Sequence, residues 1–275
     1  RFGGVTFALE SDAPLERSPV CEAFHVPDGV PDHTICLRFS DALPTPPADA
    51  LRRDDVFRWQ AGAQRHLLQW VSAPGDIPHF TYAVTHGAHT DVIFASAYRT
   101  GASVSTALEA VGLFDVFAAR GMLVLHSAYI VTSAGEAILF SGPSGVGKST
   151  QAALWERCAG ARVVNGDRAL VDVGKKTANG IFYAGTSGIS ENVTAPVRAI
   201  VLLGQGSENR VFVPSPQAAF AGVLSQCAYY EWDARSAEQM TECVARLVSD
   251  VPVLRMDCLP NATAVEALRG KLGGI

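Results

Sequence analysis

The chain has 275 residues, 48% of them hydrophobic and 18% charged, so it can bury a sizeable core and is long enough for two domains. Its formal net charge is −5 and it has no lysine- or arginine-rich run, which excludes the usual signature of a nucleic-acid or anionic-membrane surface. We find no signal peptide and no long apolar run, and therefore expect a cytoplasmic protein without a membrane partner. The six cysteines are scattered without metal-ligand spacing, so small buried thiols are expected.

Short runs rich in Val, Ile, Phe and Thr dominate the first part of the chain, separated by Gly, Pro and Asp. We expect strands at residues 3–10, 21–26, 33–40, 57–62, 65–72, 79–85 and 90–97, and a loop at 42–50. An apolar helical face follows over residues 103–121. With the boundary near this helix, residues 1–118 are predicted to form a strand-rich accessory domain of β or α+β class.

Strands and helices alternate in the second part, so residues 119–275 are predicted to form an α/β domain. Two strands joined by a tight turn, 122–131 and 137–141, lead into a glycine-rich loop. The other expected strands are 161–167, 170–174, 181–185, 197–205 and 251–257, and the expected helices are 148–160, 215–228, 233–250 and 261–272. Ser215, Asp233 and Asn261 are expected to cap the last three helices.

The glycine-rich loop fits the phosphate-binding pattern G-x-x-x-x-G-K-[ST] at every position. Glycines let successive backbone N–H groups turn towards phosphate oxygens, and the following helix adds its positive N-terminal end. Lys148 is expected to reach the β- and γ-phosphates, and the Ser149 hydroxyl to bind Mg²⁺. ATP with Mg²⁺ is therefore the expected ligand, held by Gly142, Pro143, Ser144, Gly145, Val146, Gly147, Lys148, Ser149 and Thr150.

A metal-bound nucleotide also needs a carboxylate, and the stretch after the loop helix offers two. Asp167 follows Asn165-Gly166, where the backbone leaves the strand, and we favour it as a ligand of Mg²⁺ and as the group that accepts a hydroxyl proton. Asp172 is the alternative, and if it has no such role it is expected on a solvated sheet face.

The guanine motif N-K-x-D and the transporter motif L-S-G-G-Q are both missing from the sequence, which argues against a GTPase switch and a transporter ATPase. The stretch "LHSAYIVTSAGEAILFSGPSGVGKST", followed by "NGDRAL", instead resembles the bacterial HPr kinase/phosphorylase superfamily and its HPr kinase-like relatives. The resemblance covers roughly residues 120–272. It implies a P-loop kinase domain similar to the nucleotide-binding part of phosphoenolpyruvate carboxykinase.

The resemblance also implies roles for individual residues. Asp167 matches the catalytic aspartate of that family, and His126 matches the histidine beside the transferred phosphate. Without the resemblance, His126 would read as an ordinary core histidine. Arg168 is expected either to contact phosphate or to form an ion pair with Asp167.

This chain departs from the family at two places, one linked to the reverse activity and one to the acceptor. HPr kinases proper carry two adjacent acids where this chain has Gly166-Asp167, which leaves the reverse phosphorylase activity in doubt. The relatives often carry Pro-Trp before a Gly in the loop over the substrate, whereas this chain has "GTSGISENVT" at 185–194. This loop is expected to face the acceptor through Ser187, Ser190, Glu191 and Asn192.

The sequence therefore predicts a kinase that phosphorylates a hydroxyl, serine above all, on a peptide, a protein or a small molecule, and a peptide-tailoring kinase is included. The alternative is a nucleotide-binding regulatory ATPase that binds a partner through residues 1–118 and has no phosphoryl acceptor. Decarboxylation of the carboxykinase kind is not expected, because we do not find the extra metal ligands and carboxylate-binding arginines of that family in the sequence. The oligomeric state stays open, a homo-oligomer included.

The remaining histidines are dispersed among strands and turns. "THGAHTD", residues 85–91, resembles a metal-binding stretch, but an exposed hairpin loop is the preferred interpretation.

Overall fold

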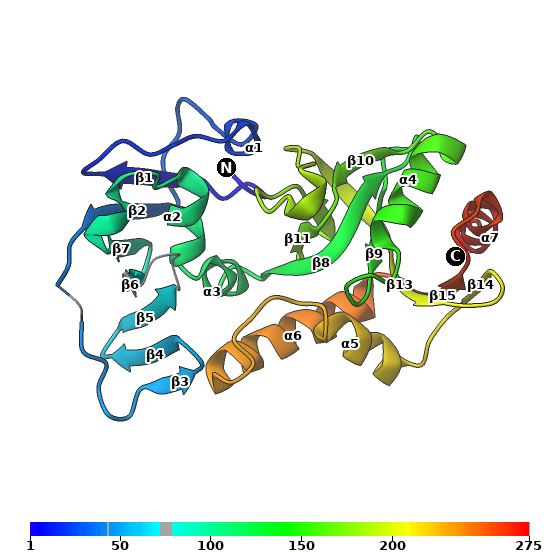
Figure 1. Cartoon of the computed structure of the whole chain (residues 1–275). Helices are drawn as coiled ribbons and strands as arrows, with labels where there is room; N and C mark the ends of the chain where they lie inside the picture. Colours follow the sequence, from blue (N-terminus) through cyan, green and yellow to red (C-terminus); the bar gives the residue numbers. More distant parts are fainter. Residues whose placement is uncertain (43, 72–78, 275) are drawn as a thin grey trace. The chain divides into compact units, whose positions relative to one another are not determined.

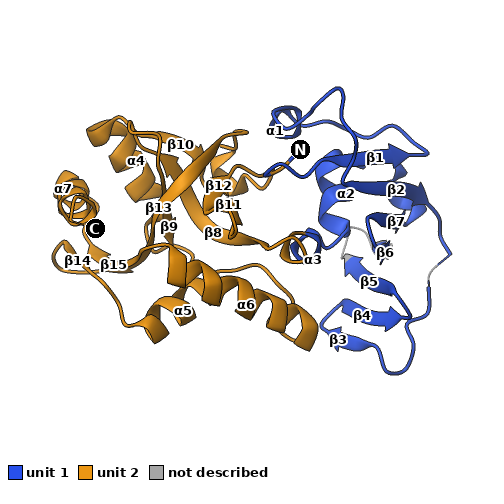
Figure 2. Cartoon of the chain, turned by 180° about the vertical axis from the view of Figure 1, so that it is seen from behind, with its two compact units in different colours: residues 1, 3–116 blue, residues 2, 117–275 orange. Residues whose placement is uncertain are grey.

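A computed structural model of the chain describes residues 1–42, 44–71 and 79–274. The protein is of mixed α/β class and divides into two compact units (Figure 2). Unit 1 contains residues 1 and 3–116, and unit 2 contains residues 2 and 117–275. The sequence-based boundary lay between residues 118 and 119. Among the described residues, no helix is long and apolar enough to cross a membrane.

Unit 1 is built on a seven-stranded sheet with strand order β1-β2-β7-β6-β5-β4-β3 (Figure 1). Its strands are β1 (Phe7–Ser11), β2 (His33–Phe39), β3 (Leu51–Arg53), β4 (Val56–Ala61), β5 (Gln64–Val71), β6 (His79–His86) and β7 (His89–Phe94). β1, β2 and β7 are parallel, and the strands from β7 to β3 form an antiparallel meander. Along β2 the alternation buries Ile35 and Leu37 and leaves Cys36 half-exposed, so the two faces of this region differ.

Two expectations for the first part of the chain were wrong. The predicted strand at 21–26 is replaced by the short helix α1 (Pro19–Glu22) and a turn, because Ser18 caps the chain there and Pro19 stands at the first helical position. The predicted helix over 103–121 is broken at Gly112, whose φ is 67°. It forms α2 (Val104–Ala110) and α3 (Leu113–Ala118), preceded by the 3₁₀ turn η1 (Ser96–Arg99).

Some details of the first part were missed or cannot be compared. The short edge strand β3 was not predicted. Residue 43 of the predicted loop and residue 72 of a predicted strand lie outside the described residues.

All six cysteines are free thiols, but none is fully buried and Cys158 is exposed, so the expectation of buried thiols was too strong.

Unit 2 contains an eight-stranded mixed sheet in which β8 and β9 form the predicted antiparallel hairpin. Its strands are β8 (Met122–Val131), β9 (Ala137–Ser141), β10 (Arg162–Asn165), β11 (Arg168–Asp172), β12 (Thr177–Asn179), β13 (Thr194–Gln205), β14 (Arg210–Phe212) and β15 (Val253–Cys258). β9 and β15 both run parallel to β13. The strand that enters the glycine-rich loop is therefore antiparallel to one neighbour and parallel to the other.

Helices cover both faces of this sheet, which gives a three-layer arrangement (Figure 1). The helices are α4 (Lys148–Ala159), α5 (Pro216–Leu224), α6 (Ala234–Asp250) and α7 (Ala262–Leu272). α4 and α7 pack together on one face, where Trp155 and Leu268 are buried. α5 and α6 pack on the other face, where Val223 and Val244 are buried.

The predicted caps hold in two of the three helices. The Ser215 and Asp233 side chains accept hydrogen bonds from N–H groups of the first turns of α5 and α6. Asn261 stands at the cap position of α7 but makes no side-chain cap bond, because its carboxamide oxygen accepts from Asn209 and Thr263 instead.

One strand of unit 2 was misplaced. The strand expected at 181–185 is irregular and leads into the 3₁₀ turn η2 (Gly185–Ser187), and β12 at Thr177–Asn179 pairs with β11 instead. The apolar side chains of Ile181 and Phe182 are buried, which explains why this stretch resembles a strand in sequence. The short strand β14 was not predicted.

Candidate functional site

The glycine loop, residues 142–149, connects the end of β9 to the start of α4. Gly142, Gly145 and Gly147 have φ values of 142°, 78° and 112°, in the region that residues with a side chain rarely adopt. A Cβ atom at position 142 would also lie 3.1 Å from the Val146 side chain and 3.3 Å from the Leu203 carbonyl oxygen. The two fixed glycines of the motif, and Gly145 between them, are therefore required by the backbone conformation itself.

Lys148 begins α4 and is buried, although lysine is seldom buried in proteins. Its ammonium group donates to the carbonyl oxygens of Gly142 at 2.8 Å and Pro143 at 3.1 Å, so it lies under the glycine loop. Burial lowers the pKa of Lys148, and the Asp167 carboxylate opposes that shift. Among the other residues expected to hold the nucleotide, Pro143, Ser144, Ser149 and Thr150 have exposed side chains.

The strand pair β8 and β11 brings three more predicted residues together. His126 on β8 lies directly opposite Arg168 on β11, and Asp167 immediately precedes β11. The His126 Nε2 atom lies 3.6 Å from Asp167 Oδ1, and Arg168 Nε donates to Asp167 Oδ2 at 3.2 Å. His126, Asp167 and Arg168 are therefore adjacent, and Arg168 forms the ion pair with Asp167 that was one of its two expected roles.

The electrostatics of this group keep the histidine neutral. Burial lowers the pKa of His126, and the nearby cation Lys148 lowers it further, against an opposing effect of Asp167. The Arg168 guanidinium adds to the lowering and also lies 5.3 Å from the Tyr183 ring centre. Near pH 7 the imidazole is therefore uncharged, and it can donate one hydrogen bond and accept another.

The alternative carboxylate, Asp172, lies at the other end of β11. It is opposite Met122 in the strand register, whereas Arg168 is opposite His126. The Asp172 carboxylate accepts from the backbone N–H of Lys175 and pairs with the Lys175 ammonium, both at 2.9 Å. It is only 8% exposed, so the expectation of a solvated sheet face was wrong, and it stands at the end of β11 away from His126 and Asp167.

Asn165 is a residue that sequence reasoning passed over. It is fully buried, and its carboxamide oxygen accepts from the backbone N–H groups of Asp167 and Arg168, each at 2.9 Å. Its amide group donates to the carbonyl oxygens of Ile181 and Tyr183, also at 2.9 Å. One side chain therefore fixes both the Asp167 backbone and the segment that leads into η2. The signal was present in "NGD", where an asparagine stands at the end of a buried strand.

Asn165→Ala should lower the free energy of unfolding of unit 2 by about 3 kcal/mol. The substitution leaves buried N–H and C=O groups without partners, and each unsatisfied group costs about 1–3 kcal/mol. Urea unfolding followed by circular dichroism measures the change. Asn192→Ala is the matched control, because Asn192 is exposed, and a change within about 0.5 kcal/mol is expected there. Equal stability of the two variants would contradict the role of Asn165.

The loop expected to face the acceptor divides into two parts. Its first part approaches Asp167: a Cβ on Gly185 would lie 2.7 Å from both Cβ and Cγ of Asp167, and Ser187 lies against Gly166. The Ser190 hydroxyl donates to the Ile181 carbonyl oxygen and is used in holding the loop.

The second part of the loop leaves the neighbourhood of Asp167. Glu191 forms an ion pair with Arg162, at the opposite end of β10 from Asn165, and its N–H donates to Val164. Asn192, the next residue, is exposed. Of the four residues expected to face an acceptor, Ser187 lies against Gly166 and Ser190 accepts from the Asn165 carboxamide, so these two are near Asp167.

Gly185→Ala should reduce turnover far more than Gly188→Ala. Both glycines have left-handed φ values, 54° and 65°, so the backbone cost of the substitution is similar. A Cβ at Gly188 meets no atom within 4 Å, whereas at Gly185 it forces Asp167 to move. A displacement of about 1 Å in a catalytic group can cost on the order of 100-fold in rate. ADP formation in the presence of ATP, Mg²⁺ and an acceptor measures this difference for both variants, and equal turnover would contradict it.

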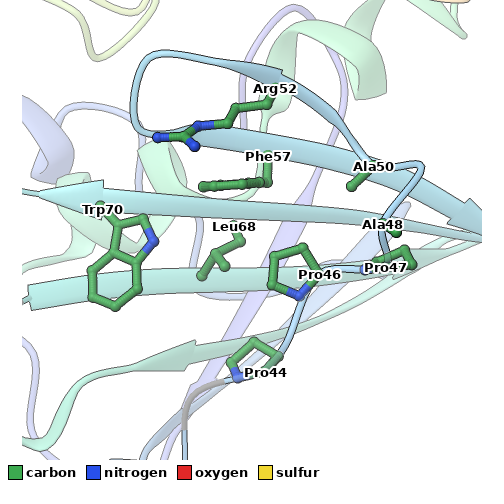
Figure 3. Close-up of a pocket in the computed structure, with 9 residues that line it drawn as sticks. All are labelled: Pro44, Pro46, Pro47, Ala48, Ala50, Arg52, Phe57, Leu68 and Trp70. Atoms are coloured by element: carbon green, nitrogen blue, oxygen red, sulfur yellow. The ribbon is translucent and has the colours of Figure 1, made fainter.

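A separate concavity lies in unit 1, beside the edge of the sheet. Figure 3 shows Pro44 and Pro46, on the segment before β3, on the same side as Phe57, Leu68 and Trp70 of β4 and β5. The cavity measures about 510 Å³ and its lining is mostly apolar. Sequence reasoning did not find it, because its residues come from three separate stretches of the chain.

No protein-family model matches the chain, and no curated protein sequence matches it significantly. The geometry and chemistry of the site residues therefore carry the functional inference.

Proposed function

We propose that the protein is an ATP- and Mg²⁺-dependent kinase that transfers the γ-phosphate to a hydroxyl group. The observation that carries this proposal is the convergence of His126, Lys148, Asp167 and Arg168 beside the glycine loop. A buried ammonium under three glycines of left-handed conformation suits a triphosphate. At positions 145 and 147 a Cβ would meet no atom within 4 Å, so packing does not explain these two glycines.

In the proposed reaction Asp167 is the general base. Its carboxylate takes the proton of the acceptor hydroxyl while the oxygen attacks the γ-phosphorus, and the bond from that phosphorus to the bridging oxygen of ADP breaks. Lys148 would exchange its carbonyl contacts for phosphate oxygens and stabilise the charge that builds there. Neutral His126 would donate a hydrogen bond to the transferred group, and Arg168 would hold Asp167 in orientation.

The metal is assigned to Ser149 and Asp167. Ser149 is exposed in the first turn of α4, and the Asp167 carboxylate is close enough to Lys148 to affect its pKa, so an oxygen donor set of the kind Mg²⁺ prefers borders the loop. Mg²⁺, when bound, would neutralise charge on the phosphoryl oxygens. We include Asp167 in both roles because a single carboxylate can bind the metal and accept the proton in turn.

The resemblance to HPr kinase-like proteins also supports the proposal of a kinase. The antiparallel hairpin before the loop, with His126 on it, and Asp167 one helix later are the features on which that resemblance rests. We therefore assign unit 2 to the P-loop kinase type, similar to the nucleotide-binding part of phosphoenolpyruvate carboxykinase. The single acid at 166–167 makes a forward kinase the preferred direction.

The acceptor is proposed to bind beside the first part of the loop, next to Gly185 and Ser187, because these residues flank Asp167. A peptide, a protein or a small molecule with a serine-like hydroxyl fits this position. Incubation with ATP, Mg²⁺ and a panel of serine-containing peptides and small alcohols, followed by mass spectrometry, tests the proposal. Addition of one phosphate to an acceptor is the expected result.

A nucleotide-binding regulator is the second candidate function. The apolar cavity in unit 1 favours it, because it offers a recognition surface that no catalytic residue assigned above shares. The two functions differ in one measurement. A kinase releases ADP faster when its acceptor is added, whereas a regulator turns over ATP slowly and no compound of the acceptor panel becomes phosphorylated.

A further inference from the structure

The exposed face of the parallel strands in unit 1 carries a group of metal-ligating side chains. Glu10 on β1, Cys36 on β2 and Asp91 on β7 are register partners, so they form one row across three adjacent strands. His89 precedes Asp91 by two residues on β7 and therefore points to the same face. β1, β2 and β7 lie side by side in both views (Figures 1 and 2).

The distances within this row suit a single ion. One ligand atom each from Cys36, His89 and Asp91 lies within 4.8 Å of the other two. His89 Nε2 is 3.4 Å from Asp91 Oδ1, and Cys36 Sγ is 3.5 Å from Glu10 Oε2. With zinc–ligand bonds of about 2.0–2.3 Å, neighbouring ligands of a tetrahedral ion are about 3.3–3.8 Å apart. Small side-chain rotations would therefore complete the geometry.

The charge at this position is also appropriate for a cation. The Glu10 and Asp91 carboxylates stand on either side of Cys36 in the row, and Arg38 is the cation on the same face of β2. The His89 and Asp91 side chains are 44% and 56% exposed, which leaves the row open to an ion from solvent.

We propose that Cys36, His89 and Asp91, with Glu10 as a fourth ligand, bind Zn²⁺ or another divalent transition metal. Sulfur and imidazole donors together select this class of metal over Mg²⁺ and Ca²⁺, which prefer oxygen donors alone. The site is separate from the glycine loop and its residues take no part in the proposed phosphoryl transfer. On binding, Cys36 gives its thiol proton to solvent and the sulfur–metal bond replaces the sulfur–hydrogen bond.

The turn at Gly87-Ala88 is the exposed hairpin loop that was preferred over a metal-binding stretch for "THGAHTD". The missing partner, Cys36, comes from the neighbouring parallel strand, and sequence alone does not reveal that pairing. Occupancy of the site would link β1, β2 and β7, and binding to the folded state alone would stabilise unit 1.

The test uses the full chain, stripped of metal with a chelator and kept free of nucleotide. Zn²⁺ affinity and stoichiometry are measured by competition with a chromophoric chelator, and Co²⁺ is added separately for absorption spectroscopy. We expect one equivalent of Zn²⁺ to bind and Co²⁺ to show a thiolate charge-transfer band. Cys36→Ser and His89→Ala should each lower Zn²⁺ affinity by more than about 10-fold, since even outer-shell changes reach that size.

The controls are Cys158→Ser and His25→Ala, which change exposed residues outside the row and should bind Zn²⁺ like the unaltered chain. Circular dichroism shows whether each variant is folded. If a variant of the row fails to fold, the Co²⁺ band of the unaltered chain decides. Absence of a thiolate band, or affinities of Cys36→Ser and His89→Ala equal to those of the controls, would overturn the proposal.

Discussion

Lys148→Ala is expected to lower the affinity for ATP by on the order of 100-fold or more and to abolish turnover. Loss of one partner of a desolvated charge pair costs about 2–5 kcal/mol in binding, which corresponds to that factor. The ammonium lies under the loop and donates to the Gly142 and Pro143 carbonyl oxygens, which it can exchange for phosphate oxygens. An alanine removes the charge and leaves both carbonyl oxygens without this donor.

Equilibrium binding of a fluorescent ATP analogue measures the effect. Lys175→Ala is the control, because the Lys175 side chain is 71% exposed and its ion pair is with Asp172, which lies at the Met122 end of β11. That variant should bind ATP as the unaltered chain does. Tight ATP binding by Lys148→Ala would remove the basis for assigning the glycine loop to nucleotide.

The parts of unit 2 that follow from local sequence rules were predictable. The glycine loop is fixed by conformational needs that glycine alone meets, and the hairpin of β8 and β9 by two apolar runs around a short turn. The caps of α5 and α6 follow from Ser215 and Asp233. Each of these features depends on residues close together in the chain.

Features that depend on distant residues were missed. The role of Asn165 requires carbonyl groups near residues 181–183, which the fold brings to it. Ile181 and Phe182 are apolar because they are buried, although they do not pair in a strand, and this made their stretch resemble a strand in sequence. In the same way, Cys36 and His89 meet only because β2 and β7 are neighbours in the sheet.

The contrast between Asp167 and Asp172 shows where sequence reasoning needed the structure. Both carboxylates follow the loop helix and the short strand after it, and each suits a metal ligand by position alone. The strand register separates them: Asp167 lies at the His126 end of β11, and Asp172 at the Met122 end. Since their chemistry is identical, the pair also provides a matched experiment.

Asp167→Asn is expected to reduce kcat for phosphoryl transfer by about 10²–10⁴-fold, the usual contribution of a general base. Asparagine has the same shape and can still accept from Arg168 Nε, so the site geometry is kept while the proton acceptor is lost. ATP binding should remain, because Lys148 and the glycine loop are unchanged. Single-turnover transfer to the identified acceptor and parallel ATP-binding titrations separate the two quantities.

Asp172→Asn makes the same chemical change at the carboxylate that binds the turn at Lys175. It should leave kcat within about a factor of two, because a residue remote from the reacting atoms contributes little to the barrier. Its effect should fall on stability, since Asp172 is almost buried and its contacts with Lys175 include a charge. Full transfer activity in Asp167→Asn would refute its role as base. Loss of transfer in both variants would mean that the rate depends on the total charge along β11 and not on the Asp167 carboxylate as a base.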